Sequence, residues 1–315
     1  MISSIELAGI CGVSQGTVDR ALHNRPGINP RTREMVLKTA EAHGYRPHPG
    51  ALEILGKTSK TVACVMSSIN NVFFMDMLNV IRTGIRCLGR RFVITAADNA
   101  AELIESLRDF SARRCPAAVI VPPEDNILIP PDITGNMSVI SLLSPCRGGN
   151  IRFISPDEES TGKRAVDYLV SAGHRHIMHL TCSRKAYAVS ARIRGYRYAM
   201  KEHGLKPVVR VEKNVADLAG LVRREKVSAI FCHNDWLALM AIRKLAECGV
   251  RVPEHVSVLG VDNSPTFTAL YPGLTTLEYP SEWLRDQTVR IFSGKKPLKK
   301  SPCFNLVERQ TVARI

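Results

Sequence analysis

Residues 12–25 read "GVSQGTVDRALHNR", a glycine turn and a serine followed by a short and polar helix-forming segment. Ser14 is a natural N-cap, so this stretch predicts a helix over residues 15–22. The apolar residues of that helix share one face, and they are Val18, Ala21 and Leu22. A helix that only filled a core would not need the polar residues that the stretch places on its other face.

The flanking residues predict two more helices. Ser3 and Glu6 have the spacing of a capping box, which favours a helix that runs to about Cys11. Asn29 and Pro30 suit the N-cap and first position of a third helix, "RTREMVLKTAEAH", which ends before a glycine. Eight residues are candidates for a small shared core: Ile5, Leu7, Ala8, Val13, Val18, Leu22, Val36 and Ala40. Residues 1–46 therefore predict a helix-turn-helix domain.

The second helix has the length and chemistry of a DNA-reading helix, of which only the first turns enter a major groove. Arg20 could bond bidentately to guanine and Gln15 could read adenine, with Gly16 between them at the surface. Ser14, Thr17 and the amides of the helix N-terminus could hold phosphates. A three-helix domain that docks on another protein is the alternative.

Composition indicates an ordinary soluble protein with a basic surplus. Of the 315 residues 45% are hydrophobic, and 43 Lys and Arg against 29 Asp and Glu give a net charge of +14. That charge favours polyanionic partners, although a solubilising surface explains it equally well. The nine cysteines form no CxxC pair and lie mostly in apolar runs, which indicates a reducing cytoplasm. We expect no signal peptide and no transmembrane segment.

From Thr61 onward apolar strand segments alternate with helical segments. "TVACVMS", "RFVITAA", "AAVIVPP" and "MSVISLL" are separated by helical stretches, and the same alternation returns after Asp157 with "HIMHLTC", "VSAIFCHN" and "VSVLGVD". This periodicity predicts parallel sheets covered by helices. Two successive doubly wound units indicate an α/β body of two lobes over residues 61–315, with a ligand cleft at the strand ends.

Both parts of the chain resemble the LacI/GalR family of transcription regulators. In the head the resemblance runs from Ser3 to Pro47 and includes "GVSQGTVDRAL" and "GYRP". In the body it includes "DEESTGKRAVDYLVSAGHRHI", "RIRGYRYAM" and "CHNDWLALMAIRKLAECGVRVPEHVSVLGVDN", and extends to the periplasmic sugar-binding proteins. The resemblance implies that Gln15, Gly16 and Arg20 contact bases. Asp19 stands where the family usually has serine, so it could orient Arg20 or another basic side chain.

Residues 47–60, "PHPGALEILGKTSK", read as a linker. The resemblance implies a hinge helix that folds on DNA and pushes an apolar side chain into the minor groove, here Ile54. An apolar wedge of this kind can unstack a base step and kink the duplex. An unstructured tether is the alternative.

For the body, the resemblance implies that Arg192, Asn234 and Asp262 hold an effector. Arginine, amide and carboxylate groups can grip hydroxyls in paired hydrogen bonds, which suits a sugar or a sugar derivative. A nucleobase or another small metabolite is the second choice, and Arg194 competes with Arg192 for the same role. Aromatic candidates beside the effector are Phe73 or Phe74, and Trp236.

The resemblance further implies a homodimer on a pseudo-palindromic double-stranded DNA operator, with repression favoured over activation. His174, His176, His179 and Cys182 invite a zinc site, but their spacing fits no standard one. The chain offers no convincing nucleophile, paired carboxylates or phosphate-binding loop, so we expect no catalytic residues, metal or cofactor. The rival interpretations are a cytoplasmic metabolite-binding protein with a decayed DNA-binding head and an enzyme acting on sugars.

Overall fold

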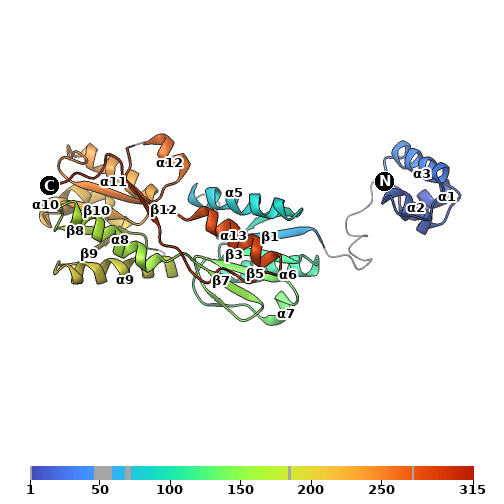
Figure 1. The fold of residues 1–315 in the computed structure, drawn as a ribbon, viewed down its shortest axis with the longest axis horizontal. Coiled ribbons are helices and arrows are strands. Elements are labelled where there is room, and N and C mark those ends of the chain that lie inside the picture. Colours follow the sequence, from blue (N-terminus) through green and yellow to red (C-terminus); the bar gives the residue numbers. More distant parts are fainter. Residues whose placement is uncertain (1, 46–58, 68–71, 184–185, 272) are drawn as a thin grey trace. The chain divides into compact units, whose positions relative to one another are not determined.

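The computed structural model describes residues 2–45, 59–67, 72–183, 186–271 and 273–315. The chain separates into two compact units, Met1–Thr58 and Ser59–Ile315, which we call the head and the body (Figure 1). The proposed linker falls largely between the described parts, and Ile54 lies outside them.

The described part of the head consists of three helices, α1 (Ser4–Ile10), α2 (Gln15–Leu22) and α3 (Pro30–Ala42). The predicted capping box at Ser3 and Glu6 is present, with each side chain accepting a hydrogen bond from the other residue's backbone amide. Ser14 caps α2 by accepting from the Thr17 amide, and Asn29 caps α3. The local sequence signals therefore fix where each helix begins.

The core of the head is small and comes from all three helices. Its buried members are Leu7, Ala8, Val18, Ala21, Val36 and Ala40, while Val13 and Leu22 are partly buried against them. The expectation for Ile5 was wrong, because its side chain is 69% exposed. The seven-residue α1 turns Leu7 and Ala8 inward, so Ile5 falls on its solvent face.

One lobe of the body is built on a parallel sheet in the order β2-β1-β3-β5-β7. Its strands are β1 (Thr61–Met66), β2 (Arg91–Ala96), β3 (Ala117–Val121), β5 (Ser138–Leu142) and β7 (Ile151–Ile154). Its helices are α5 (Val72–Cys87), α6 (Ala100–Ala112) and the short α7 (Pro131–Thr134), and β4 (Ile127–Leu128) pairs with β6 (Cys146–Arg147). We call this the N-terminal lobe.

The other lobe, the C-terminal lobe, has a sheet in the order β13-β12-β11-β10-β8-β9, which is parallel except for the β12–β13 pair. Its strands are β8 (Ile177–Thr181), β9 (Val208–Val211), β10 (Ala229–Cys232), β11 (Ser257–Asp262), β12 (Thr276–Glu278) and β13 (Asn305–Val307). Its helical elements are α8 (Glu158–Ser171), α9 (Tyr187–Glu202), η1 (Glu212–Asp217), α10 (Leu218–Arg224), α11 (Asp235–Glu247) and α12 (Pro265–Leu270).

Alternation along β1 shows how the N-terminal lobe buries its sheet between helices. Val62, Cys64 and Met66 belong to the core that α5 covers. Ala63 and Val65 belong to the core that α6 covers on the opposite face. A strand buried on both faces is typical of a parallel sheet between two helical layers, so the predicted two-lobed α/β class is confirmed.

The chain passes between the lobes three times, as Figure 1 shows. It leaves β7 for α8, returns after β12 to form α13 (Ser281–Phe292), and then leaves again to form β13. Helix α13 packs on α5 of the N-terminal lobe, where Gly84 makes room for Val289. Connections of this kind let two lobes rotate against each other about a common set of strands.

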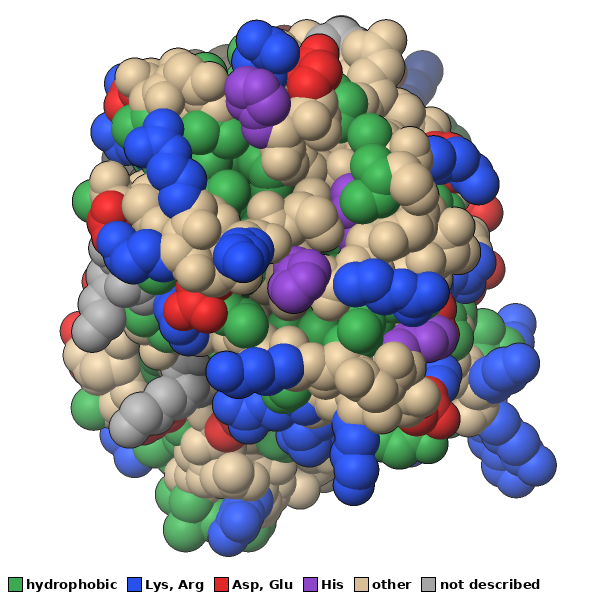
Figure 2. Space-filling view, turned by 90° about the vertical axis from the view of Figure 1, so that its left-hand side faces the viewer, with side chains coloured by type: hydrophobic (Ala, Val, Ile, Leu, Met, Phe, Trp, Pro, Cys, Tyr) green, Lys and Arg blue, Asp and Glu red, His purple; other side chains and the backbone are tan. Residues whose placement is uncertain are grey.

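Both units have more basic than acidic residues. The head contains seven Lys and Arg and five Asp and Glu, whereas the body contains 36 and 24. Figure 2 shows many Lys and Arg side chains over the end of the C-terminal lobe, with few acidic ones among them. In the part of the chain that the structure describes, every helix is too short or too polar to cross a bilayer.

Candidate functional site

The polar face of α2 presents the side chains that could read DNA. Arg20 is exposed, and the described residues give it no ion-pair partner. The Gln15 amide donates to Ser4 Oγ at 2.8 Å. Gly16 leaves open space, since a methyl group there would have Ser14 Oγ at 3.9 Å as its nearest neighbour. This polar face of α2 is therefore open, and a partner with a flat surface could approach it closely.

Asp19, which follows the family pattern poorly, has basic partners other than Arg20. Its carboxylate lies 2.7 Å from Arg25 Nη1 and 3.1 Å from His23 Nδ1. The charge that would repel phosphate is thus balanced within the head, and Arg20 keeps its hydrogen-bond donors for another partner.

In the body, two glycines bring α8 and α9 into close contact. A methyl group at Gly195 would overlap the carbonyl oxygen of Glu159, and one at Gly162 would overlap that of Arg192. The two helices can therefore cross at a distance that only glycine allows. This crossing sets Arg192, on α9, against Glu158, the first residue of α8.

Arg192 and Glu158 form a buried ion pair. Arg192 Nε lies 2.6 Å from Glu158 Oε2, with 4% and 0% of the two side chains exposed. Arg192 also donates through Nη1 to the carbonyl of His233 and covers the ring of Phe304 at 5.4 Å. Glu158 Oε1 is buried, and none of the described residues forms a hydrogen bond with it. Between the two candidate arginines, Arg192 is thus the inward one, whereas Arg194 pairs with Glu159 at the surface.

Asp262 ends β11 beside this pair with an unusual backbone. Its φ is 115° and that of Asn263 is 51°, values that residues other than glycine rarely adopt and that concentrate at functional sites. Burial raises the pKa of Asp262 well above its ordinary value; Arg192 opposes this rise, and neighbouring carboxylates, Glu158 among them, add to it. Burial also raises the pKa of Glu158, again against the pull of Arg192.

A second carboxylate, Asp235, holds the segment after β11 in place. It accepts from the Ser264 amide at 3.0 Å and from Thr276 Oγ1 at 2.6 Å. Burial raises the pKa of Asp235 to about 6, although both hydrogen bonds lower it. Ser264 Oγ donates to Asp76, on α5 of the other lobe. This contact ties the two lobes together at the edge of the cluster.

Aromatic residues close the cluster on the side of the crossing segments. Phe73 meets Tyr279 edge-on with ring centroids 5.1 Å apart, and Tyr279 meets Phe304 in the same way at 5.2 Å. Phe74 is buried in the core of the N-terminal lobe. Trp236 is 55% exposed and lies against Phe267 at 5.9 Å.

Asn234 is the N-cap of α11 and forms its hydrogen bond with a backbone amide. Its side-chain oxygen accepts from the Leu237 amide at 2.9 Å and so caps α11. It follows directly after His233, whose carbonyl accepts the hydrogen bond from Arg192. Asn234 therefore lies next to the charged cluster while it also has a capping role.

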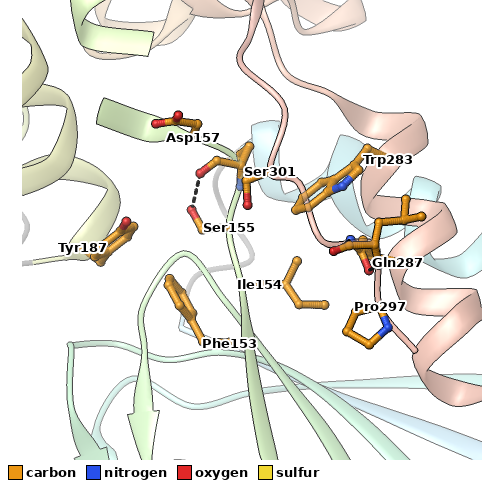
Figure 3. A pocket seen from close by; sticks show the side chains of 11 residues that line it. Phe153, Ile154, Ser155, Asp157, Tyr187, Trp283, Gln287, Pro297 and Ser301 are labelled. Carbon is orange, nitrogen blue, oxygen red and sulfur yellow. Dashed lines mark hydrogen bonds between the residues drawn. The ribbon is translucent and has the colours of Figure 1, made fainter. Parts of the chain in front are cut away.

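A hollow of about 420 Å³ lies where the chain crosses between the lobes. Figure 3 shows Phe153 and Tyr187 on one side of it and Trp283 and Gln287 across from them. Tyr187 comes from the C-terminal lobe, and its backbone amide donates to Asp125 of the N-terminal lobe at 2.9 Å. Trp283 Nε1 is buried and donates to no acceptor among the described residues. Rotation of the lobes would change the walls of this hollow.

The histidines that suggested a metal have protein partners instead. His174 contacts Ser228 Oγ and the carbonyl of Ala313, each at 3.1 Å. His179 contacts the carbonyl of Phe231 and stacks on its ring at 4.4 Å. Burial lowers the pKa of His179 to about 4, so the ring is neutral at pH 7. Among the described residues no three His, Cys, Asp or Glu side chains are grouped to hold a metal.

The structure brings three of the predicted effector residues into one cluster, namely Phe73, Arg192 and Asp262. Sequence reasoning missed Glu158 and Tyr279. Glu158 stands in an acidic run that is also typical of an ordinary helix N-terminus, and only the α8–α9 crossing distinguishes it from Glu159. Tyr279 follows a three-residue strand that has no pattern of its own.

Known proteins are similar to this chain in both the head and the body. The family model for a periplasmic binding protein-like domain matches residues 166–311. Among curated relatives, the HTH-type transcriptional regulator AscG of Escherichia coli K12 is 28% identical, with 89% of this chain and 88% of AscG covered. GalS of Salmonella typhimurium, a regulator of the same type, is 26% identical with coverages of 99% and 97%.

Solved structures share the fold. The Lac repressor dimer bound to operator and the anti-inducer ONPF aligns with a TM-score of 0.80 and 20% identity over 99% of each chain. The complex of the transcriptional regulator CelR with cellobiose aligns with a TM-score of 0.68 and 23% identity over 99% of this chain and 100% of the other. The two-part fold and the relatives that match nearly the whole chain agree with the motifs of the head and body: this chain is similar along its length to HTH-type transcriptional regulators, as its resemblance to the LacI/GalR family implies.

Proposed function

We propose that this regulator binds a pseudo-palindromic operator as a homodimer, and that a small molecule held between the lobes controls its affinity for that operator. Residues 1–46 would read DNA, residues 47–60 would link, and residues 61–315 would bind the effector and dimerise. The observation that carries the proposal is the open polar face of a capped α2, with Arg20 free of ion pairs among the described residues.

The contacts of the head follow from the position of each side chain. Arg20 can reach guanine with two hydrogen bonds, and Gln15 can exchange its bond to Ser4 for one to adenine. Gly16 lets the helix approach the base edges closely, and Ser14 and Thr17 lie beside the phosphates at the N-terminus of α2. Ile54, outside the described residues, would be the minor-groove wedge of the linker.

The effector site would lie around Arg192, Asn234 and Asp262, with Phe73, Phe74 and Trp236 as aromatic candidates near it. The buried ion pair and the strained Asp262 support this choice, because charges are rarely buried without a functional reason. CelR was solved with cellobiose, which makes a sugar or a sugar derivative the first ligand class to test.

An effector would act by changing the angle between the lobes. Contacts such as Asp76 with Ser264 and Asp125 with Tyr187 would form in one arrangement and break in another. An effector shifts that equilibrium only by its difference in affinity for the two arrangements. We infer a cytoplasmic repressor without enzymatic activity.

Selection from a random duplex pool by the purified protein, at one stated salt concentration, tests the proposal. We expect enrichment of a palindrome with a flexible step at its centre. Absence of any enriched sequence at low salt would contradict the proposal and favour a metabolite-binding protein with a decayed head.

Asp262→Ala tests whether effector binding in the body controls DNA binding by the head. The variant should bind the selected duplex as the wild type does and should lose its response to the effector. A full effector response in Asp262→Ala would remove this residue from the site. Glu159→Ala, which changes a surface ion pair on the same lobe, is the control.

A further inference from the structure

The charged cluster between the lobes has more buried carboxyl groups than buried cations. Arg192 pairs with Glu158, and both side chains are almost fully buried. Asp262 is 7% exposed, and the described residues give its carboxylate no hydrogen-bond donor. One buried cation thus faces two buried carboxylates.

The hydrogen bonds of Arg192 limit what it can offer a ligand. Its Nε is used by Glu158 and its Nη1 by the carbonyl of His233, while Phe304 covers one face of the guanidinium. A ligand carboxylate or phosphate could reach Arg192 through its Nη2 donors, but it would then share this cation with Glu158. The protein already supplies the anion that Arg192 would otherwise attract.

Two further carboxylates, Asp76 and Asp235, lie near this cluster. Asp76 faces the cluster from α5 through its bond to Ser264, and Asp235 lies behind the same serine. The next cation is Arg309, which donates to Asn263 Oδ1 at 2.9 Å and to the carbonyl of Leu274 at 2.7 Å. Arg309 therefore compensates the Asp235 side of the cluster.

Glu158 Oε1 gives a second and independent sign of an absent partner. The oxygen is buried, and it accepts no hydrogen bond from the part of the chain that the structure describes. A buried carboxylate oxygen usually has a donor, because leaving it unsatisfied costs free energy. A ligand that carries N–H donors and a positive charge would satisfy this oxygen and compensate Asp262 at once.

We propose that the effector carries a protonated amino group beside its hydroxyls, as an amino sugar does, and that Glu158 and Asp262 receive this ammonium. This inference rests on the proposed effector site. A neutral sugar would leave Asp262 without a cation beside it, and a sugar acid or sugar phosphate would bring a further negative charge to these carboxyl groups. Glu158 is then the residue that determines the charge of the effector.

Matched sugars test the proposal on the full-length protein. Thermal unfolding followed by tryptophan fluorescence reports on the body, since both tryptophans, Trp236 and Trp283, belong to it. The probes are glucosamine with glucose, galactosamine with galactose, and mannosamine with mannose, with glucose 6-phosphate and galacturonate as anions. We expect at least one amino sugar to raise the unfolding temperature and its neutral counterpart to raise it less. Stabilisation by the neutral or anionic sugars alone, or by no amino sugar at millimolar concentration, would overturn the proposal.

Glu158→Gln removes the charge of this side chain and keeps nearly the same shape, so it tests the role of the charge alone. The variant should weaken binding of the stabilising amino sugar about tenfold or more, as expected for loss of one charge partner, and should leave or improve binding of the neutral sugar. Glu159→Gln is the matched control and should change neither. If Glu158→Gln does not fold, Asp262→Asn takes its place with the same expected result. Equal affinities in wild type and variant would contradict the role of Glu158.

The outcome can be separated from that of the proposed function. If duplex selection yields a palindrome but no amino sugar stabilises the body, the proposal of an operator-binding regulator is kept, and only the proposed charge of its effector is wrong. If an amino sugar binds but no duplex is enriched, the cleft assignment stands and the DNA-reading role fails.

Discussion

The reading face of α2 and the cluster between the lobes use charge in opposite ways. In the head, Arg20 is exposed and without an ion pair among the described residues, and Asp19 is balanced locally by Arg25. In the body, Arg192 is buried and paired, and Asp262 is buried with no hydrogen-bond donor to its carboxylate from the described residues. A site that meets DNA keeps its cation in water until binding, whereas a site that encloses a small molecule arranges its charges in advance.

Two neighbouring ion pairs on α8 and α9 give the sharpest test of that contrast. Glu158→Ala should destabilise the body by about 3–5 kcal/mol, because it removes the carboxylate to which the buried Arg192 donates through Nε. Glu159→Ala removes the surface pair with Arg194 and should cost about 0–1 kcal/mol. Urea unfolding followed by tryptophan fluorescence measures both. Equal losses would show that burial does not distinguish the two pairs.

The neutral His179 predicts how the body responds to acid. Its pKa is about 4 when folded and near 6.5 when unfolded, so the unfolded chain binds the extra proton between these values. Stability from this group is complete above pH 6.5 and should fall by about 3 kcal/mol as the pH approaches 4. The difference in unfolding free energy between wild type and His179→Phe should shrink over that range. A difference that stays constant with pH would contradict the assignment.

The exposed cation of the head should matter for DNA and not for folding. Arg20→Ala should weaken operator binding by about 1–3 kcal/mol and relax the preference at one base pair. Lys38→Ala, on the exposed surface of α3, is the control and should leave that preference intact. Competition binding with single-base operator variants measures both. If Arg20→Ala keeps the full preference at every position, another side chain reads that base.

The smallest expected effect concerns the start of α1. Ser3→Ala removes one half of the capping box and should cost the head about 1 kcal/mol. Amide hydrogen exchange in α1 detects this loss, and the exchange of buried amides in β1 serves as the internal control. Faster exchange in both places would indicate that the change is not local to the head.

Local signals explain why the head could be predicted almost to the residue. Ser3, Ser14 and Asn29 lie next to the helices that they cap, so no distant contact is needed to place them. Ile5 was misplaced because a helix of seven residues allows more than one apolar face. In the body the long alternating segments predicted the two sheets, whereas the strands β7, β12 and β13 went unrecognised because three or four residues show little pattern. Helix α13 was also not predicted, although its buried residues follow a helical spacing, because two of them are the polar Gln287 and Thr288.

The proposed effector site around Arg192, Glu158 and Asp262 was harder to predict, because its residues are far apart in the sequence. Glu158 and Arg192 are 34 positions apart, and Ser264 and Asp76 are 188 apart. The resemblance to the family predicts Arg192 and Asp262 as effector residues, but it does not show that Glu158 already forms an ion pair with the arginine. That information depends on the glycine-mediated crossing of α8 and α9.

The most direct test of an effector-controlled DNA reader is the affinity of the full-length protein for its selected duplex, with and without a sugar that stabilises the body. We expect the sugar to change that affinity by about tenfold or more in the wild type, the usual scale of coupling between two sites, and to leave Asp262→Ala unaffected. A sugar that stabilises the body of the wild type and leaves its operator affinity unchanged would contradict the account.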